Sequence, residues 1–468
     1  MLFIKRHWLL FLGLGLVLPV IWPLFRQDFF LMHDWTHVAR LVELDLALKL
    51  GQIPPRWAPD FGWGYGMPLF HFYPPLPYYL AELFHLIKLP AVWSIKLIFA
   101  LNYLAGFYFM YLWAKTKWGK IGGIFSATAF LYLPYRAVQF YVRGSLGELT
   151  AMTFLPLLFY GLKKKNLILS ATAWAAVFLS HNVIALFSLL FIPLYFLFNL
   201  KSWRQFILIS VFTFGLSAFF ILPAFFERNL TIVDSLTGGY FDYRLHFIYL
   251  RQLWQRSWGF GGSIFGLEDN ISFQLGWPHI LMVLPAFLFW KKNLYIFFSL
   301  AISIFLMTFH SQFIWDRIPL LAMAQFPWRL LVFSGVFVAF LSGSVVRLIK
   351  QKFLLFSFII IIVGLNFNYF RPEKFSLPED YYYTDRQRIA NEMSDILFDY
   401  LPKNAQKPTS PRSLDSPLQQ FDFLTVSVNS EGKLQFKKTP IQLWSDIISL
   451  ISWFILIIYV IRSFRIRA

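Results

Sequence analysis

The sequence predicts an all-α polytopic membrane protein with about twelve transmembrane helices and a small mixed α/β extracytoplasmic segment near the C-terminus. Of its 468 residues, 58% are hydrophobic and only 14% are charged, whereas a soluble domain carries roughly 25% charged residues. Aromatic residues reach 21%, which is typical of lipid-facing helices with aromatic belts at the interfaces. The sequence contains no Cys, which excludes disulfides and thiolate metal sites.

Twelve apolar stretches approach the roughly 20 residues that a spanning helix requires. They cover residues 8–25, 93–114, 121–138, 147–162, 166–180, 184–200, 205–224, 277–290, 293–309, 330–346, 353–369 and 443–461. The first stretch follows Lys5 and Arg6, as in a signal peptide. Its length and the lack of a small-residue cleavage site favour a retained helix.

The distribution of charge predicts the orientation of these helices. If the N-terminus lies inside, the inner segments carry basic residues and no Asp or Glu; they are residues 5–6, 115–120, 163–165, 201–204, 291–292, 347–352 and 462–467. The acidic residues, from Asp28 to Asp446, then fall on the outer side. By the positive-inside rule we expect a multi-pass plasma-membrane protein with both termini cytoplasmic. The net charge of +18 is therefore mainly a topology signal, and we expect no nucleic-acid partner.

The same map divides the chain into three parts. Residues 1–369 form a transmembrane domain that includes a long first outer loop, residues 26–92. Residues 370–442 form a small extracytoplasmic module, in which 385–400 reads as an amphipathic helix and 421–436 as a β-hairpin with its turn at 429–432. Residues 443–468 form the final helix and a basic cytoplasmic tail.

The first outer loop opens with Asp34 at the N-cap position of an apolar-periodic stretch that ends at Gly51. His37 shares a helix face with Asp34, and Arg40 shares one with Glu43. This spacing alone favours a capped interfacial helix with a surface ion pair over a catalytic carboxylate. The Gly- and Pro-rich aromatic segment at 62–79 suits either anchoring in the headgroup layer or stacking on a sugar.

Further polar residues stand where apolar helices meet the outer side, and ionisable groups at membrane depth are costly and usually functional. They are Tyr135, Arg136, Arg143, Glu148, His181, Asn182, Glu227, Arg228, His310 and Arg329. Two simpler interpretations stay open. Arg143 and Glu148 can pair with each other, and Arg329 can extend to lipid headgroups instead of binding a phosphate.

No Gly-rich phosphate loop, zinc motif or nucleophile elbow is present in the sequence. The order of motifs between about residues 25 and 330 does resemble a known family. After the acidic residue come IPPRW, GYGMPLFHFYPPLPYYL, RGSLGE, SHN, QLGWPH and QFPWR. The chain resembles the bacterial membrane proteins labelled "6-pyruvoyl-tetrahydropterin synthase-related", which are grouped with the GT-C glycosyltransferases.

The resemblance implies a GT-C-like transmembrane core and a lipid-phosphate sugar donor in a groove near the outer face. It also implies that an acidic residue of the first outer loop is the general base or a metal partner, and Asp34 matches that position. The doubled acid of some GT-C enzymes is absent, because His33 and Trp35 flank Asp34. We therefore assign no metal ligand, and a divalent cation, Mg²⁺ or Mn²⁺, stays open as a cofactor.

These observations lead to a hypothesis of glycosyl transfer from a polyprenyl-phosphate-type donor to a glycan or lipid acceptor at the outer face of the plasma membrane. A carboxylate takes the acceptor's proton, and cations stabilise the leaving phosphate. Asp34 and His37 are the catalytic candidates. The candidates for substrate and phosphate binding are Arg143, Arg228, Arg329, His181, Asn182, Glu148, Arg56 and Tyr73. The expected partners are membrane lipid, the lipid-linked sugar and the acceptor.

Two other functions stay open on the sequence alone. A transporter or flippase of lipid-linked glycans should have paired halves and polar groups at mid-membrane, whereas the polar groups here gather on one side. A non-catalytic membrane scaffold with the same fold differs from the enzyme only in activity. The sequence does not indicate the sugar, the acceptor or the oligomeric state.

Overall fold

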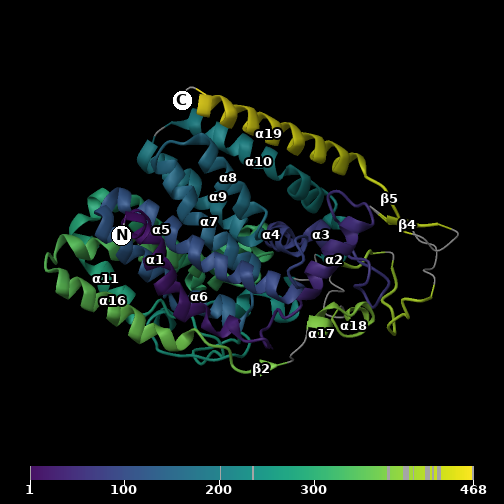
Figure 1. Ribbon diagram of the computed structural model, residues 1–468, viewed down its shortest axis with the longest axis horizontal. Coiled ribbons are helices and arrows are strands. Elements are labelled where there is room, and N and C mark those ends of the chain that lie inside the picture. Colours follow the sequence, from purple (N-terminus) through teal and green to yellow (C-terminus); the bar gives the residue numbers. More distant parts are fainter. Residues whose placement is uncertain are drawn as a thin grey trace.

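The computed structural model of the chain is predominantly helical (Figure 1). It describes residues 2–200, 202–233, 237–376, 380–393, 400–403, 405–416, 422–423, 426–429 and 434–465. The helices of the bundle are α1 (Leu2–Ile21), α5 (Ala91–Leu131), α7 (Leu146–Lys163), α8 (Leu167–Phe178), α9 (Asn182–Tyr195), α10 (Trp203–Phe226), α11 (Trp277–Val283), α12 (Leu294–Met307), α15 (Leu331–Ser342), α16 (Lys352–Asn366) and α19 (Pro440–Arg465).

Within the described residues, seven helical segments are long and apolar enough to cross a membrane. They are Trp8–Phe25, Ala91–Leu131, Asn182–Asn199, Trp203–Leu230, Trp277–Met307, Pro327–Arg347 and Pro440–Arg462. Two shorter apolar helices, Leu167–Phe178 and Phe353–Tyr369, accompany them. The chain therefore has the helices of a multi-pass membrane protein, whereas the count of about twelve spans stays a prediction.

Helix α5 joins two segments that the sequence analysis placed in separate helices. It continues through the basic segment at 115–120 and bends at Gly119, whose φ of 76° lies in the left-handed region that glycine adopts readily. The helix expected at 121–138 is interrupted at Leu133, which is extended because Pro134 follows it. The chain restarts as the short α6 (Pro134–Ala137) and a π-helical turn, Val138–Val142.

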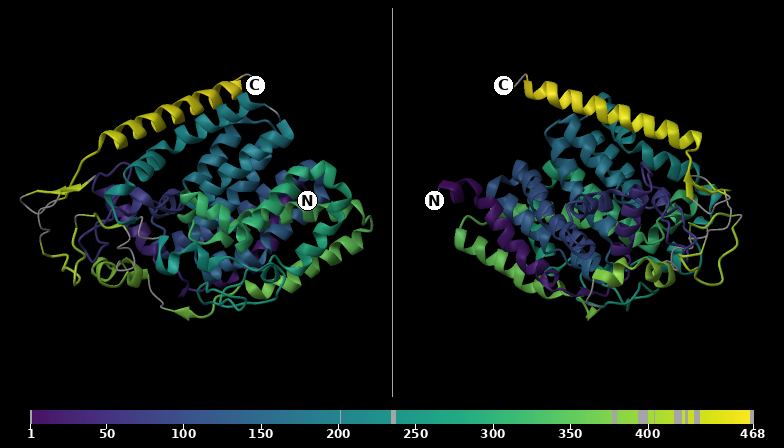
Figure 2. Two further views of the ribbon diagram at one scale, coloured as in Figure 1. Left: turned by 180° about the vertical axis from the view of Figure 1, so that it is seen from behind. Right: turned by 45° about the vertical axis from the view of Figure 1, so that its right-hand side comes forward.

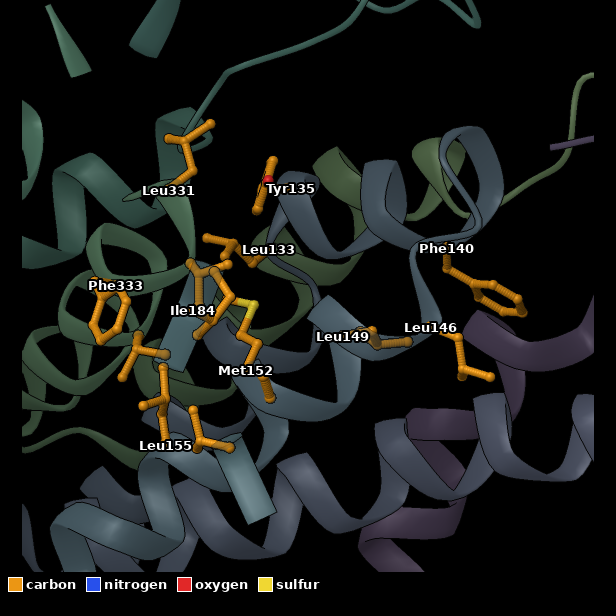
Figure 3. Close-up of a cluster of buried hydrophobic side chains, with 14 of the residues drawn as sticks. Leu133, Tyr135, Phe140, Leu146, Leu149, Met152, Leu155, Ile184, Leu331 and Phe333 are labelled. Carbon is orange, nitrogen blue, oxygen red and sulfur yellow. The ribbon is translucent and has the colours of Figure 1, made fainter. Parts of the chain in front are cut away.

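The core of the bundle lies between α5, α7, α9 and α15. All twelve residues of α15 are buried, as expected for a helix that is apolar on every face. Figure 3 shows side chains from several elements in this core, including Met152 of α7, Ile184 of α9 and Phe333 of α15. By contrast, α19 lies along α10 and exposes apolar side chains such as Leu450 and Phe454, which indicates a lipid-facing helix (Figures 1 and 2).

The polar segments gather at one end of the bundle, and both chain ends lie toward the other (Figures 1 and 2). The first outer loop forms α2 (His37–Lys49), α3 (Leu69–Phe72) and α4 (Leu76–His85). Helix α2 is followed by Gly51 with a φ of 85°, as the sequence predicts. The segment between α12 and α15 adds two short helices, α13 (Gln312–Arg317) and α14 (Pro319–Ala322).

The segment at 370–442 contains short elements that contact the first outer loop. Strand β1 (Phe29–Phe30) pairs antiparallel with β2 (Phe375–Ser376). Helices α17 (Asp380–Thr384) and α18 (Arg386–Glu392) follow. The helix expected at 385–400 begins as expected, with Asp385 as the N-cap of α18, but it ends at Glu392 with Met393 as its C-cap. Residues 394–399 lie outside the described residues. The boundaries of this module stay a prediction.

The hairpin expected at 421–436 corresponds to a three-stranded sheet of β3 (Asp422–Phe423), β4 (Val426–Val428) and β5 (Leu434–Phe436). Val426 pairs with Phe436, and Val428 pairs with Leu434. Most of the expected turn at 429–432 lies outside the described residues. The sheet ends a few residues before α19 begins at Pro440, so it stands at the polar end of that helix.

The start of α7 fits tightly against the segment that precedes α9. A Cβ added at Gly147 would clash with the backbone oxygen of Ser180. We expect Gly147→Ala to separate the two segments and to destabilise the protein by about 1–3 kcal/mol. Gly364→Ala in α16 is the matched control, because nothing lies within 4 Å of the added Cβ. The measurement is the thermal unfolding midpoint in detergent; equal midpoints for the two variants would contradict this packing.

Candidate functional site

The backbone places Asp34 beside Arg143. The main-chain N–H of His33 donates to the carbonyl of Val142, and that of Asp34 donates to the carbonyl of Arg143, each at 3.0 Å. These two bonds align the segment after β1 with the chain just before α7. Asp34 is therefore fixed next to a basic residue more than a hundred positions away in the sequence.

The carboxylate of Asp34 binds the guanidinium of Arg40 through both oxygens. Arg40 Nη2 lies 2.8 Å from Oδ1 and Nη1 lies 2.9 Å from Oδ2. The hydroxyl of Tyr73 donates to Oδ2 at 3.1 Å. The prediction that Asp34 caps the following helix is wrong: Thr36 occupies the N-cap position, without a side-chain cap. Asp34 precedes the helix by a turn, so its carboxylate can meet a side chain of the helix instead of its N–H groups.

The predicted pair between Arg40 and Glu43 is also wrong. Arg40 is occupied by Asp34, while Glu43 accepts the main-chain N–H of Asp60 at 2.8 Å. Asp60 in turn binds Arg386 of α18 at 2.6 and 2.8 Å. Burial of Glu43 and the nearby charge of Asp60 raise the pKa of Glu43 well above its usual value. Arg40 and Glu43 of α2 thus hold neighbouring segments, whereas Asp45 and Lys49 pair along the helix surface.

His37 is buried and hydrogen-bonded through both ring nitrogens. Its Nε2 contacts the carbonyl of Gly144, and its Nδ1 lies 2.8 Å from the hydroxyl of Tyr78. Because a carbonyl only accepts, Nε2 carries the proton and Nδ1 accepts from the tyrosine. Burial lowers the pKa of His37, although the charge of Asp34, 3.7 Å away, opposes this. His37 is therefore a neutral side chain that holds the loop before α7, and its predicted catalytic role stays untested.

The neighbours of Asp34 lower its pKa by more than burial raises it. Burial alone raises the pKa, but the charge of Arg40, the nearby imidazole of His37 and the hydrogen bonds from Arg40 and Tyr73 lower it from 3.8 to about 2. The side chain is still 28% exposed. Asp34 is therefore ionised at physiological pH and partly accessible.

Glu148, at the start of α7, is fully buried and is the centre of a second network. Nη1 of Arg143 lies 2.9 Å from each carboxylate oxygen. The hydroxyl of Tyr135 donates at 2.6 Å and the amide of Gln139 at 3.1 Å. Nε of Arg329 approaches to 3.7 Å. The open alternative that Arg143 and Glu148 pair is thus what the structure shows.

The cations of this network are oriented but not fully enclosed. The guanidinium of Arg143 stacks on Trp328, 4.6 Å from the ring centroid, and that of Arg329 stacks on Phe326 at 4.8 Å. The side chains of Arg143 and Arg329 are 11% and 13% exposed. The Nε of Arg329 has no hydrogen-bond partner among the described residues. Two oriented cations therefore keep some access to the outside.

Of the other predicted residues, His181 joins this network and Asn182 supports the loop beside it. His181 caps α9 by accepting the N–H of Ile184 with Nδ1, so Nε2 carries the proton, and Nε2 lies 3.9 Å from Glu148. The amide of Asn182 donates to the carbonyl of Phe72 at 2.9 Å. This bond holds the residue next to Tyr73, so Asn182 reaches the Asp34 network through the backbone.

Two predicted residues have their contacts elsewhere. Arg56 donates to Asp446 at 3.0 Å and to the carbonyl of Phe219 at 2.9 Å. Arg228 contacts the sulfur of Met323 at 3.2 Å and lies over the ring of Phe225. The sequence places both near the outer face, but spacing along the chain does not indicate which helix ends meet.

Sequence reasoning missed two members of the networks. Tyr78 links His37 to Arg40, whose Nη1 lies 3.2 Å from its hydroxyl. Gln139 comes directly after the segment predicted as a helix at 121–138. Nothing distinguishes Tyr78 from the other aromatic residues of its loop. For Gln139, Pro134 was an available sign that the helix ends early and turns polar groups toward α7.

The surroundings of Asp34 do not fit a divalent cation. Both of its oxygens bind Arg40, and the neighbouring carboxylate of Glu148 binds Arg143. A hard cation needs several free oxygen ligands, and the described residues include no group of three or more His, Asp or Glu in a ligating arrangement. We therefore assign no chemical step at Asp34 to a metal.

The comparisons with known proteins give distant similarities. No family model matches the chain. An uncharacterized protein of Lactococcus lactis subsp. cremoris is 26% identical over 307 residues, which cover 60% of this chain and 46% of that protein. The chain thus spans less than half the length of that relative. Among solved structures, the arabinofuranosyltransferase AftD from Mycobacteria has a TM-score of 0.47 and 15% identity over 78% of this chain and 27% of that one. None of these similarities assigns the chain to a family.

The low pKa of Asp34 predicts a pH-dependent contribution to stability. The folded state binds the proton more weakly than the unfolded state, so the contribution is present above pH 4 and is lost as the pH falls toward 2. A shift from 3.8 to about 2 corresponds to about 2 kcal/mol. We expect the difference in thermal unfolding midpoint between the wild type and Asp34→Asn to be large at pH 7 and to shrink by pH 3. A difference that is independent of pH would contradict the ion pair.

Removing the carboxylate of Glu148 should destabilise the protein more than removing the carboxylate of Asp34. Glu148→Gln leaves Arg143 and Arg329 without their buried counter-charge, and such a loss typically costs about 3–5 kcal/mol. Asp242→Asn is the control, because it removes an exposed pair with Arg244 that is worth at most about 1 kcal/mol. Thermal unfolding in detergent measures both. A similar, small effect of the two substitutions would show that Glu148 does not hold the network together.

Proposed function

We propose that this chain is a GT-C-type membrane glycosyltransferase that transfers a sugar from a polyprenyl-phosphate-type donor to a glycan or lipid acceptor at the outer face of the plasma membrane, with both termini cytoplasmic. One observation carries the proposal. The ionised carboxylate of Asp34 lies beside a pair of oriented arginines, and the hydrogen bond from its N–H to the Arg143 carbonyl links the two groups. The motif resemblance of the first outer loop supports it.

In this proposal Asp34 takes the proton of the acceptor hydroxyl. A general base works best when its pKa is near the operating pH, and the pKa of Asp34 is about 2. Glycosyl transfer tolerates a weak base, because the acceptor oxygen becomes a strong acid once it bonds to the anomeric carbon. The negative charge of Asp34 also stabilises the positive charge that develops at that carbon. Arg40 and Tyr73 keep the carboxylate ionised and oriented.

Arg143 and Arg329 stabilise the leaving phosphate. The negative charge on this group grows as the bond to the sugar breaks, and oriented guanidinium groups lower the barrier most when they are already in place. Arg329 is the first to engage, because its Nε lacks a hydrogen bond and its contact with Glu148 is the longer one at 3.7 Å. Glu148 holds both arginines until the donor binds.

The same ion pairs support a second candidate function, a non-catalytic scaffold with this fold. In such a protein Glu148 and Asp34 would neutralise Arg143 and Arg40 permanently, and the networks would only join helices. The two functions differ in one respect: an enzyme must accept a phosphate at Arg143 and Arg329, and a scaffold need not.

We expect Asp34→Asn to reduce sugar transfer by at least about 100-fold, because one carboxylate supplies both proton removal and charge stabilisation. The assay uses the purified full-length chain with polyprenyl-phosphate sugars and detects the product by mass spectrometry. Asp45→Asn is the matched control: it lies on the same helix, α2, and pairs with the exposed Lys49.

Transfer by the wild type and by Asp45→Asn, together with loss in a folded Asp34→Asn protein, would support the proposed role. Unchanged transfer by Asp34→Asn would remove Asp34 from that role. Absence of transfer by the wild type with every donor tested would favour the scaffold.

A further inference from the structure

A separate group of charged side chains lies where α19 begins. Arg56 donates to Oδ1 of Asp446 at 3.0 Å, and Lys438 donates to Oδ2 at 2.7 Å. Because both oxygens are used, a single carboxylate holds two cations close together. Within the described part of the chain, no hydrogen bond or ion pair joins these three side chains to Asp34 or Glu148. A ligand bound here is therefore independent of the proposed glycosyl transfer.

These cations line a cavity of about 120 Å³ between the segment after α2 and the segment that leads into α19. Its lining includes Ile53, Arg56, Lys437, Lys438 and Gln442. A single water needs roughly 10–15 Å³ when volume is measured in this way. The cavity therefore has room for the several oxygens of a phosphoryl group.

Two cations at the cavity share a single carboxylate. Arg56 and Lys438 both bind Asp446, and Glu227 is a further acidic residue that faces Arg56. The carboxylate of Glu227 already accepts hydrogen bonds from Thr439 and from Gln442 at 2.9 Å, and Nε2 of His71 lies 2.8 Å from it. The group of Arg56, Lys438 and Asp446 therefore keeps one positive charge, and the N-terminal end of α19 adds a partial positive charge.

A buried donor in this lining also lacks an acceptor. Arg56 is only 3% exposed, yet its Nε has no hydrogen-bond partner among the described residues. A buried guanidinium N–H without an acceptor costs free energy that a bound anion recovers. The cavity therefore combines space, positive charge and an unused buried donor.

The surface next to the cavity is apolar. Ile53 in its lining is 71% exposed, Trp444 in the first turns of α19 is 64% exposed, and Phe226, which precedes Glu227, is 59% exposed. Trp444 and Phe226 lie on helices long enough to span a membrane, and exposed apolar side chains at such positions suit contact with acyl chains. We propose that the cavity binds the phosphoryl group of an anionic membrane lipid, whose acyl chains lie along α10 and α19.

The test measures lipid binding to the full-length chain in non-ionic detergent by titration calorimetry. The probes are dioctanoyl phosphatidic acid, dioctanoylglycerol, which lacks the phosphate, and inorganic phosphate. The wild type should bind the phosphatidic acid, and Lys438→Gln should weaken binding about fivefold or more. Lys438→Arg, which keeps the charge, should stay within about twofold. The control Lys374→Gln, at an exposed lysine of the same outer side, should bind like the wild type.

The probes also identify the source of the phosphoryl group. Tighter binding of phosphatidic acid than of inorganic phosphate supports a lipid, whereas equal, Lys438-dependent binding of both supports the site but assigns it to free phosphate. Undiminished binding by a Lys438→Gln protein with a normal unfolding midpoint would overturn the proposal. It would also be overturned if phosphatidic acid did not bind, or if dioctanoylglycerol bound as tightly.

Discussion

The polar end of this helix bundle depends on the buried carboxylate of Glu148. A charge at that depth is tolerated only when it is paired and hydrogen-bonded, and its partners come from several segments. Tyr135 and Gln139 belong to the interrupted stretch after α5, and Arg143 precedes α7. Arg329 stands at the start of the stretch that leads into α15. One carboxylate thus joins the ends of several helices. Asp34 lies next to this network because its main-chain N–H donates to the carbonyl of Arg143.

This arrangement sets the condition for any phosphate that binds at the site. A phosphate competes with Glu148 for Arg143 and Arg329. The free energy of binding is therefore the difference between the contacts that the arginines make with the phosphate and those that they make with Glu148. Such an exchange favours an anion that carries more charge than one carboxylate, as a leaving phosphate does. In the proposed reaction, the ground state of the donor would therefore gain less than the transition state, which is the condition for catalysis by differential binding.

Apolar length predicted several of the helices, because it is a local feature of the sequence. The ends of the segments expected at 147–162 and 205–224 fall within two residues of α7 and α10. The segment expected at 121–138 failed at Pro134, where a local steric effect outweighs a continuous apolar composition. The candidate site was predictable by residue type but not by partner. Which carboxylate meets which arginine depends on contacts between distant segments. The i, i+3 rule therefore assigned Arg40 to Glu43, whereas the bend before α2 brings Asp34 within reach of Arg40 instead.

The central claim is that Asp34 and the arginines around Glu148 form one reaction centre. The most direct measurement is a cryo-EM structure of the full-length chain with a polyprenyl-phosphonate sugar analogue that cannot be cleaved. The account predicts that the phosphonate oxygens contact Arg143 and Arg329 and that the anomeric carbon faces the carboxylate of Asp34. An analogue bound at another site, with the pairs of Glu148 and Asp34 intact, would contradict it.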